Sequence, residues 1–152
     1  MFRLSQSAGY AVRALSCLDE DGRADASLGE ISARSGVPAA YLRKLAKRLV
    51  ATGLLTTRRG RRGGVRLSRS AGRISLLEVV RAFEPADVLQ GCLLGPGACR
   101  GLRACPLHAF WQREQRRILN MLAGRTLAEL IAYETARRDR RNPRRRRMRL
   151  CE

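Results

Sequence analysis

Three of the chain's five cysteines and its only histidine lie between residues 92 and 108. Cys92, Cys99, Cys105 and His108 are separated by six, five and two intervening residues, in a stretch that also contains glycine and proline. Thiolate and imidazole are the ligands that zinc and iron–sulphur clusters prefer, and an irregular loop can wrap several of them around one centre. The pattern therefore predicts a metal site.

The last two of these side chains are expected to be positioned by a helix. Pro106 suits the first position of a helix, which would make Cys105 the cap and place His108 in the first turn. Both could then point at one centre. The spacing is looser than the C-x2-4-C pair of common zinc sites, so zinc and an iron–sulphur cluster both remain candidates.

Two other interpretations of these cysteines, disulfide bonds and a catalytic nucleophile, have less support. The chain has no apolar run long enough for a signal peptide or a membrane helix, so we expect a reducing cytoplasm without structural disulfides, and no membrane partner. A nucleophilic pair of Cys105 and His108 would leave two cysteines without a role and nothing to orient the base. Paired carboxylates, a catalytic triad and a nucleotide-binding loop are not found, and we expect no enzyme.

Charge points to a polyanionic partner. The chain carries 31 Lys and Arg against 13 Asp and Glu, a net charge of +18 and a sequence pI near 11.5. Nine arginines follow Ala136, opposed by Asp139 and Glu152, so this tail holds +7 and the rest of the chain +11. The body of the protein is itself basic.

The elements that would carry this charge form a helix-turn-helix followed by a hairpin. After an amphipathic helix over about 5–18, a capping box at Ser27 and Glu30 opens a helix that ends at Gly36, and a second helix follows over about 38–52. Strands are predicted at 54–58 and 65–67 around a glycine-rich turn. This is the pattern of a winged helix.

The proposed DNA contacts follow from that pattern. The start of the second helix should enter the major groove, and the arginines of the hairpin should lie along phosphates or at a minor groove. The predicted contact residues are Ala39, Ala40, Tyr41, Arg43, Lys44, Lys47, Arg58, Arg59, Arg61 and Arg62. Arg48 is expected on the same outer face of the helix, and Arg66 and Arg69 in the hairpin.

A longer helix is predicted from Pro106 to about Ala123, after a short one opened by the capping box of Ser75 and Glu78. Leu107, Trp111, Ile118 and Leu122 repeat along the longer helix at close to heptad spacing. Such a stripe can be an internal core, but we expect a homodimer seam, because twofold readers of double-stranded DNA need a partner helix.

The expected fold is mostly α with a small β-hairpin: a winged helix-turn-helix with a long dimerisation helix. The predicted divisions are residues 1–84 for the DNA-binding domain, 85–105 for the cysteine-rich loop, 106–136 for the dimerisation helix and a following helix, and 137–152 for a basic tail without fixed structure. Cys17 is expected only to pack in the core.

The chain resembles a known family, the Rrf family of winged-helix bacterial transcription regulators, over about residues 2–132. The matching residues include Arg3-Leu-Ser, Gly9-Tyr-Ala-Val, Tyr41-Leu, Gly63-Gly, Glu78-Val and the three-cysteine loop. Within the family, the stretch from Cys105 to Trp111 looks most like the branch that regulates iron–sulphur cluster assembly. That branch holds a 2Fe-2S cluster with three cysteines and a histidine.

The resemblance implies that Cys92, Cys99, Cys105 and His108 hold a cluster, with 2Fe-2S favoured over 4Fe-4S and zinc as the alternative. The first cysteine gap is one residue longer here than in that branch. Some nitric-oxide-sensing members take the fourth ligand from an acidic residue of the first helix, but residues 6–9 contain none, which favours His108. Arg43 stands where the branch has a base-discriminating glutamate, which predicts a different operator.

Taken together, the sequence predicts a homodimeric regulator of transcription, acting chiefly as a repressor on palindromic operator DNA. Its cluster would report iron, redox or nitrosative status through DNA affinity. The alternative is a zinc-stabilised RNA-binding protein, because cysteine-rich fingers can have a similar ligand order. The wing and the basic helix disfavour that alternative.

Overall fold

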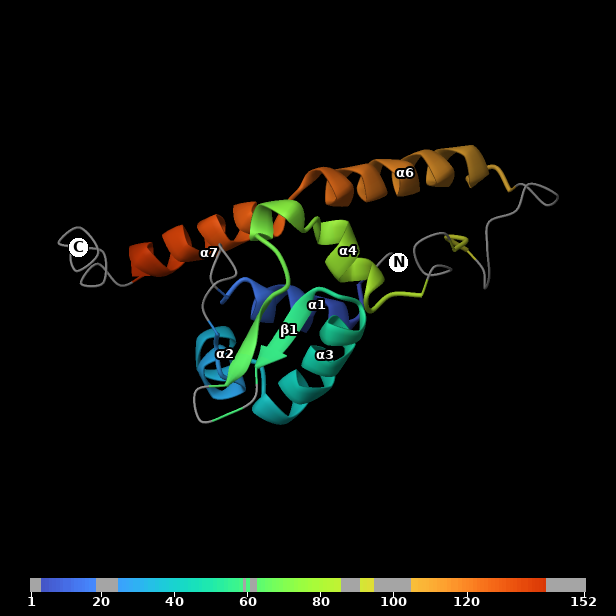
Figure 1. The fold of residues 1–152 in the computed structure, drawn as a ribbon. Helices are drawn as coiled ribbons and strands as arrows, with labels where there is room; N and C mark the ends of the chain where they lie inside the picture. The colour runs from blue at the N-terminus through green and yellow to red at the C-terminus, as the bar shows by residue number, and fades with distance from the viewer. Residues whose placement is uncertain are drawn as a thin grey trace.

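The computed structural model describes residues 4–18, 25–58, 60, 63–85, 91–94 and 105–141 (Figure 1). Its elements in chain order are α1 (Gln6–Leu15), α2 (Leu28–Ser35), α3 (Ala39–Ala51), β1 (Leu55–Arg58), β2 (Gly64–Leu67), the 3-10 turn η1 (Ala71–Arg73), α4 (Leu76–Arg81), α6 (His108–Gly124) and α7 (Leu127–Arg141). The predicted mostly helical fold with one antiparallel hairpin is confirmed.

The core lies where α1, α2, α3 and the hairpin meet α4 and the start of α7. Its most completely buried large side chains are Leu15, Leu42, Leu49, Ile74 and Leu127. Leu127 belongs to the last helix but shares one continuous cluster with Leu15 of the first. The C-terminal helix is therefore part of the core of the DNA-binding module.

The helix-turn-helix begins and ends where its residues predict. The Ser27 side chain accepts a hydrogen bond from the Glu30 backbone, while the Glu30 carboxylate accepts one from the Ser27 backbone. Gly36 ends α2 with a left-handed φ of 70°, a conformation that side chains other than glycine rarely adopt. This turn fixes the angle at which α3 leaves α2.

Three glutamates in capping boxes are held in their charged form. The pKa of Glu30 is lowered first by the hydrogen bond from the Ser27 backbone, and that of Glu129 first by the hydrogen bond from Arg125. Burial raises the pKa of Glu78, but hydrogen bonds from Ser75 and the nearby charge of Arg69 outweigh it and leave the pKa lowered. All three caps are therefore intact at neutral pH.

The hairpin is held against the segment before α2. In the hairpin Leu55 pairs with Leu67 and Arg58 with Gly64, and Val65 exchanges two backbone hydrogen bonds of 2.9 Å with Ala26. A Cβ added at Gly64 would lie 2.5 Å from the Ala26 carbonyl oxygen, which is closer than two such atoms can approach. Glycine at position 64 is thus required by the close approach of another backbone.

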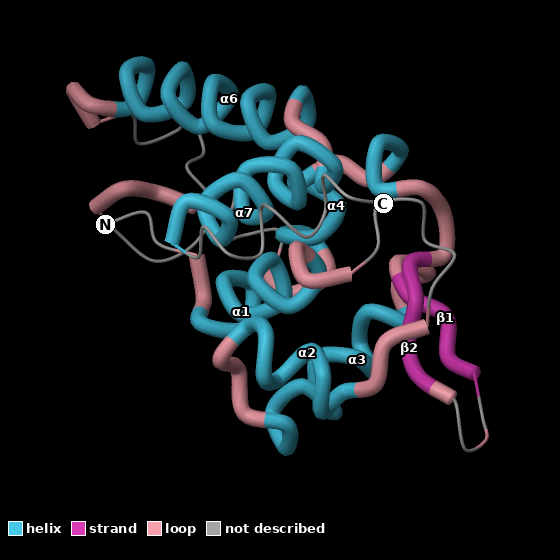
Figure 2. Tube along the Cα trace, turned by 90° about the vertical axis from the view of Figure 1, so that its left-hand side faces the viewer, coloured by secondary structure: helices cyan, strands magenta, loops and turns pink. Residues whose placement is uncertain are grey.

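The starts of α4 and α7 lie side by side. Ser75 forms a bridge with Thr126, the Leu76 amide donates to the Arg125 carbonyl at 2.9 Å, and the Leu127 amide donates to the Ile74 carbonyl at 2.8 Å. Figures 1 and 2 both place α6 on the opposite side of the molecule from α2 and α3, beyond this joint. The joint connects the long helix to the DNA-binding module.

Two local expectations are corrected. The long helix begins at His108, after a turn at residues 106–107, so Cys105 precedes the helix instead of capping it. Residues 137–141, which were predicted to belong to a tail without fixed structure, are the last residues of α7.

Among the described helices, a stretch long and apolar enough to cross a membrane is not found.

Replacing Gly64 with alanine should loosen the hairpin, because the new methyl group would collide with the Ala26 carbonyl. We expect a loss of about 1–3 kcal/mol in the free energy of unfolding, the usual cost of overpacking. Chemical denaturation monitored by circular dichroism measures this. Gly72→Ala is the matched control, because a Cβ there meets nothing within 4 Å; equal losses in the two variants would contradict the role given to Gly64.

Candidate nucleic-acid interface and metal loop

The exposed face of α3 is a single basic stripe. Ala40, Arg43, Lys44 and Lys47 are exposed, and each is three or four residues from two of the others, which places them on one face of the helix. The opposite face of α3 is buried through Leu42, Leu45, Ala46 and Leu49. The helix therefore presents its cations outward, with small alanines at its start that let a surface approach the backbone.

Tyr41 lies differently from the other predicted contact residues. Its hydroxyl is 2.8 Å from the Ser7 hydroxyl of α1, and its ring meets the Tyr10 ring edge-on, with the centroids 5.4 Å apart. Ala39 beside it is half-buried. These contacts fix the start of α3 against α1, so Tyr41 is placed to orient the helix.

The hairpin presents a second set of cations. Arg58 at the end of β1 has a side chain that is 73% exposed, and it makes a 3.5 Å ion pair with Asp25. Arg66 on β2 is also exposed. The predicted contacts Arg59, Arg61 and Arg62 lie outside the described residues.

Two arginines that were expected beside these cations make contacts within the fold. The Arg48 guanidinium lies 5.7 Å from the centre of the Phe83 ring and its Nε donates to the Ala82 carbonyl, so it ties α3 to the end of α4. Arg69 pairs with Glu78 and donates to the Arg73 carbonyl at 3.1 Å. Most partners of these two side chains belong to other segments of the chain, so a local sequence pattern could not predict them.

Two of the predicted metal ligands, Cys105 and His108, lie at the start of α6, and Cys92 follows Gly91, whose carbonyl is bonded to that helix. Cys92 and Cys105 are half-buried, and His108 is the first residue of the helix, also half-buried, with its amide bonded to the Cys105 carbonyl at 2.9 Å. Cys99 lies outside the described residues. Within the part of the chain that is described, three ligating side chains are not gathered into one group. The donor chemistry, two thiols and one imidazole beside one helix end, fits a cluster.

A pair of hydrogen bonds holds the segment before Cys92 on α6. The Trp111 Nε1 donates to the Gly91 carbonyl at 2.8 Å, and the Gln115 side-chain amide donates to the same oxygen at 2.7 Å. The two donors are one helical turn apart, and Gln115 is the buried residue of α6, at 7% exposure. We call this contact the Gly91 clamp; it fills both acceptor positions of one carbonyl oxygen.

The long helix leaves much of its apolar surface uncovered. Of the four residues predicted as a dimer seam, Leu107 is 42% exposed, while Trp111, Ile118 and Leu122 are half-buried. Phe110 and Met121 are more exposed, at 49% and 56%, and the heptad pattern did not select them. The uncovered apolar edge is therefore formed by Leu107, Phe110 and Met121.

Sequence reasoning missed the residues of the Gly91 clamp. Gly91 and Gln115 carry no distinctive pattern of their own, and only folding brings them together. Phe110 lies beside the predicted stripe, three residues after Leu107, but it was not among the predicted seam residues.

The arrangement of a helix-turn-helix with a basic outer helix and a basic hairpin defines a winged-helix DNA-binding protein. The family model described as "Rrf2: Iron-dependent Transcriptional regulator" matches residues 4–133. The HTH-type transcriptional regulator IscR of Citrobacter koseri is 36% identical over 132 residues, which span 85% of this chain and 79% of that protein. The protein of the same name from Salmonella newport matches equally well.

Solved structures agree on the fold. The structure of T. potens IscR has a TM-score of 0.69 at 23% identity, covering 87% of this chain and 88% of that chain. The global cysteine regulator CymR of B. subtilis also has a TM-score of 0.69, at 22% identity, covering 88% and 98%.

The chain thus belongs to the Rrf2 family of transcriptional regulators, a non-enzymatic family whose members bind DNA.

If α3 reads bases and the hairpin contacts phosphates, two arginine variants should behave differently. Arg43→Ala should lower discrimination between operator and random duplex by about 1–3 kcal/mol, the worth of a bidentate base contact. Arg58→Ala should weaken all duplexes evenly and reduce the salt slope of binding by about 1. Fluorescence anisotropy at several salt concentrations measures both quantities.

Arg81→Ala, on the exposed side of α4, is the control for the loss of one charge. Equal losses on specific and random DNA for Arg43→Ala would remove Arg43 from the base-reading surface.

Proposed function

We propose that this regulator is a homodimeric repressor of palindromic operators whose DNA affinity depends on an iron–sulphur cluster. The proposed ligands are Cys92, Cys99, Cys105 and His108, and a 2Fe-2S cluster is favoured. The observation that carries the proposal is the Gly91 clamp. It brings the residue before the first ligand onto the helix that begins with the last one.

The clamp supports a cluster site by shortening the distance that the ligand loop must close. Cys92 is covalently next to a carbonyl bonded to Trp111, and Trp111 is one turn after His108 on the same helix. Each clamp bond is worth about 1 kcal/mol net. These contacts, which need no metal, would bring the first and last ligands toward one end of the helix.

When bound, the cluster would supply a centre that exchanges an electron or reacts with oxidants and nitric oxide. The chain's own part would be to supply three thiolates from the loop and one neutral imidazole from the start of α6. The free energy of ligand binding would then stabilise the folded loop. Because α6 joins α7 at the Ser75–Thr126 bridge, a change in loop order can reach the DNA-binding module. The description of the matching family as iron-dependent is consistent with this role.

DNA reading is assigned to the α3 stripe and the hairpin. Arg43, Lys44 and Lys47 would meet the major groove and Arg58 the backbone, with Ala39 and Ala40 allowing close approach and Tyr41 orienting the helix. Arg59, Arg61 and Arg62 at the tip of the hairpin would add phosphate or minor-groove contacts. A palindromic operator follows from the twofold symmetry of a dimer.

The dimer is proposed along α6. Its exposed edge of Leu107, Phe110 and Met121 would otherwise leave three large apolar side chains in water. The half-buried Trp111, Ile118 and Leu122 flank this edge and would complete the seam. A seam on α6 would place the ligand loop of each chain beside the dimer contact, where loop order can change the spacing of the two α3 helices.

The cluster is tested by removing one proposed ligand and one cysteine outside the set. Cys92→Ala should largely abolish the visible absorption of anaerobically purified protein and change operator affinity. Cys17→Ala, which alters a buried thiol of the DNA-binding core, should keep both. Iron and sulphide content, measured on each protein, gives a readout independent of DNA binding. Stoichiometric zinc without iron in the parent protein would overturn the cluster.

The clamp itself is tested with Gln115→Met, which keeps the side-chain length but removes the donor. Cluster loss to a chelator should be faster, with retention about 10-fold weaker, as for other groups that orient a ligand. A parent-like loss rate would show that Gly91 plays no part in holding the cluster.

The dimer seam is tested by adding a charge to its exposed edge. Met121→Lys should raise the dimer dissociation constant at least about tenfold, because an unpaired ammonium would be buried in an apolar contact. Sedimentation velocity over a concentration series measures it. Asn120→Lys adds the same charge at an exposed neighbouring position on another side of the helix; an equal effect there, or none at Met121, would place the seam elsewhere.

A further inference from the structure

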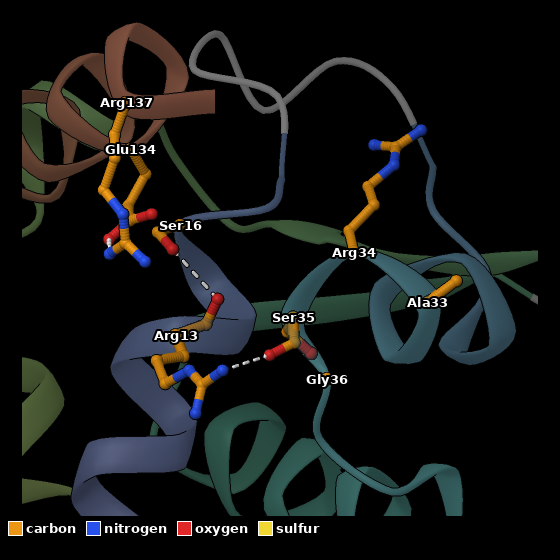
Figure 3. Close-up of a pocket in the computed structure, with 8 residues that line it drawn as sticks. All are labelled: Arg13, Ser16, Ala33, Arg34, Ser35, Gly36, Glu134 and Arg137. Atoms are coloured by element: carbon orange, nitrogen blue, oxygen red, sulfur yellow. Dashed lines mark hydrogen bonds and ion pairs between the residues drawn. The ribbon is translucent and has the colours of Figure 1, made fainter. Parts of the chain in front are cut away.

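A polar cavity lies between the helix-turn-helix and the C-terminal helix, away from the basic stripe of α3 and from the metal loop. Its volume is about 610 Å³, within the range of small-molecule sites. It is lined by Arg13 and Ser16 of the α1 region, by Ala33, Arg34, Ser35 and Gly36 at the end of α2, and by Glu134 and Arg137 of α7 (Figure 3). We call it the arginine pocket.

The charge of the pocket favours an anion with two negative charges. Among the described lining residues, Arg13, Arg34 and Arg137 are positive and Glu134 is negative, a formal sum of +2, although the charge of Arg34 also acts on Glu30 outside the pocket. The guanidinium group is suited to oxyanions because its planar donors match carboxylate and phosphate oxygens. One dianion would neutralise the pocket.

The arginines are held in place but have donors to spare. The Arg13 Nη2 donates to the Ser35 carbonyl at 2.7 Å, and the Arg137 Nη1 donates to the Glu134 carboxylate at 3.1 Å. The Arg34 Nη1 donates to the Cys17 carbonyl at 3.3 Å. Each of these bonds uses one of the five N–H donors of a guanidinium. In Figure 3, Arg13 lies beside Ser35, while Arg137 and Glu134 reach toward the pocket from α7.

The floor of the pocket is part of the turn that leads into α3. Ser16 and Ser35 are buried, at 4% and 5% exposure. A Cβ at Gly36 would lie 3.6 Å from the Arg13 Nη2, so the missing side chain keeps space next to that guanidinium. A ligand here would touch α7 and the α2–α3 turn at the same time.

We propose that the arginine pocket binds a small phosphate-type dianion, which joins α7 to the turn before α3. The site is separate from the proposed cluster ligands, so it would give the regulator a second input. Bound ligand stabilises the folded state by mass action and restrains the start of α3.

The test uses inorganic phosphate and the full chain, at constant ionic strength set with chloride. Isothermal titration should show saturable binding of one phosphate per chain, and acetate, with a single charge, should bind more weakly. Arg137→Gln should raise the half-saturating phosphate concentration about tenfold, the worth of one charge-assisted hydrogen bond. The melting temperature should rise with phosphate in the parent protein and less in the variant.

Arg140→Gln is the matched control, because it removes one exposed arginine from the same helix outside the pocket. It should bind phosphate as the parent does. If Arg13→Gln fails to fold, because Arg13 also holds Ser35, Arg137→Gln still decides the question. Unsaturable binding, equal loss in Arg140→Gln, or equal affinity for acetate would overturn the proposal.

One further outcome would reassign the pocket. If operator DNA displaced phosphate and Arg137→Gln weakened all duplexes with a lower salt slope, the arginines would belong to the DNA interface, and the small-ligand proposal would be wrong.

Discussion

Two backbone hydrogen bonds connect the long helix α6 to the DNA-binding module. They join the residues before α4 to the residues before α7, from Leu76 to Arg125 and from Leu127 to Ile74, beside the bridge between Ser75 and Thr126. Ile74 and Leu127 are both fully buried, so the joint is shielded from competing water. It adds backbone hydrogen bonds to the side-chain packing of α6 on α4 and to the burial of Leu127 in the core.

The long helix is consequently fixed near both of its ends. Near its start the Gly91 clamp binds it to the segment before the ligand loop, and at its end the joint with α4 binds it to the core. An element held in this way moves as a unit. A change in the conformation of the ligand loop would therefore shift the whole of α6, together with any partner packed along it. It would also displace the start of α7.

Local signals in the sequence predicted most of the fold because they act over three or four residues. The capping boxes at Ser27 and Ser75 and the glycine stop at Gly36 depend only on their neighbours. The contacts of Arg48 and Arg69 could not be predicted in this way, because each side chain donates to a backbone carbonyl outside its own element. Their charge suggested a phosphate contact, and only the packing of α4 shows another use.

The candidate sites also differ in whether a local sequence pattern could reveal them. The metal loop could be recognised because thiols and imidazole are rare and cluster in the sequence, whereas the Gly91 clamp joins a glycine to a glutamine 24 residues away. The arginine pocket draws on three helices, and arginine is too common in this chain for three of them to be noticed. Helical spacing found the apolar character of α6, but the exposed edge depends on which side α4 covers.

The pairing of Ala26 with Val65 has a consequence for how the protein behaves in a crowded solution. A two-stranded hairpin has two open edges, and each can recruit a strand from another molecule. Ala26 occupies the outer edge of β2 with two hydrogen bonds, so that edge is closed at its centre. The open edge is that of β1, where Thr56, Thr57 and the charged Arg58 face water. A hairpin with one edge closed and the other polar can extend from the domain to meet DNA without becoming a template for aggregation.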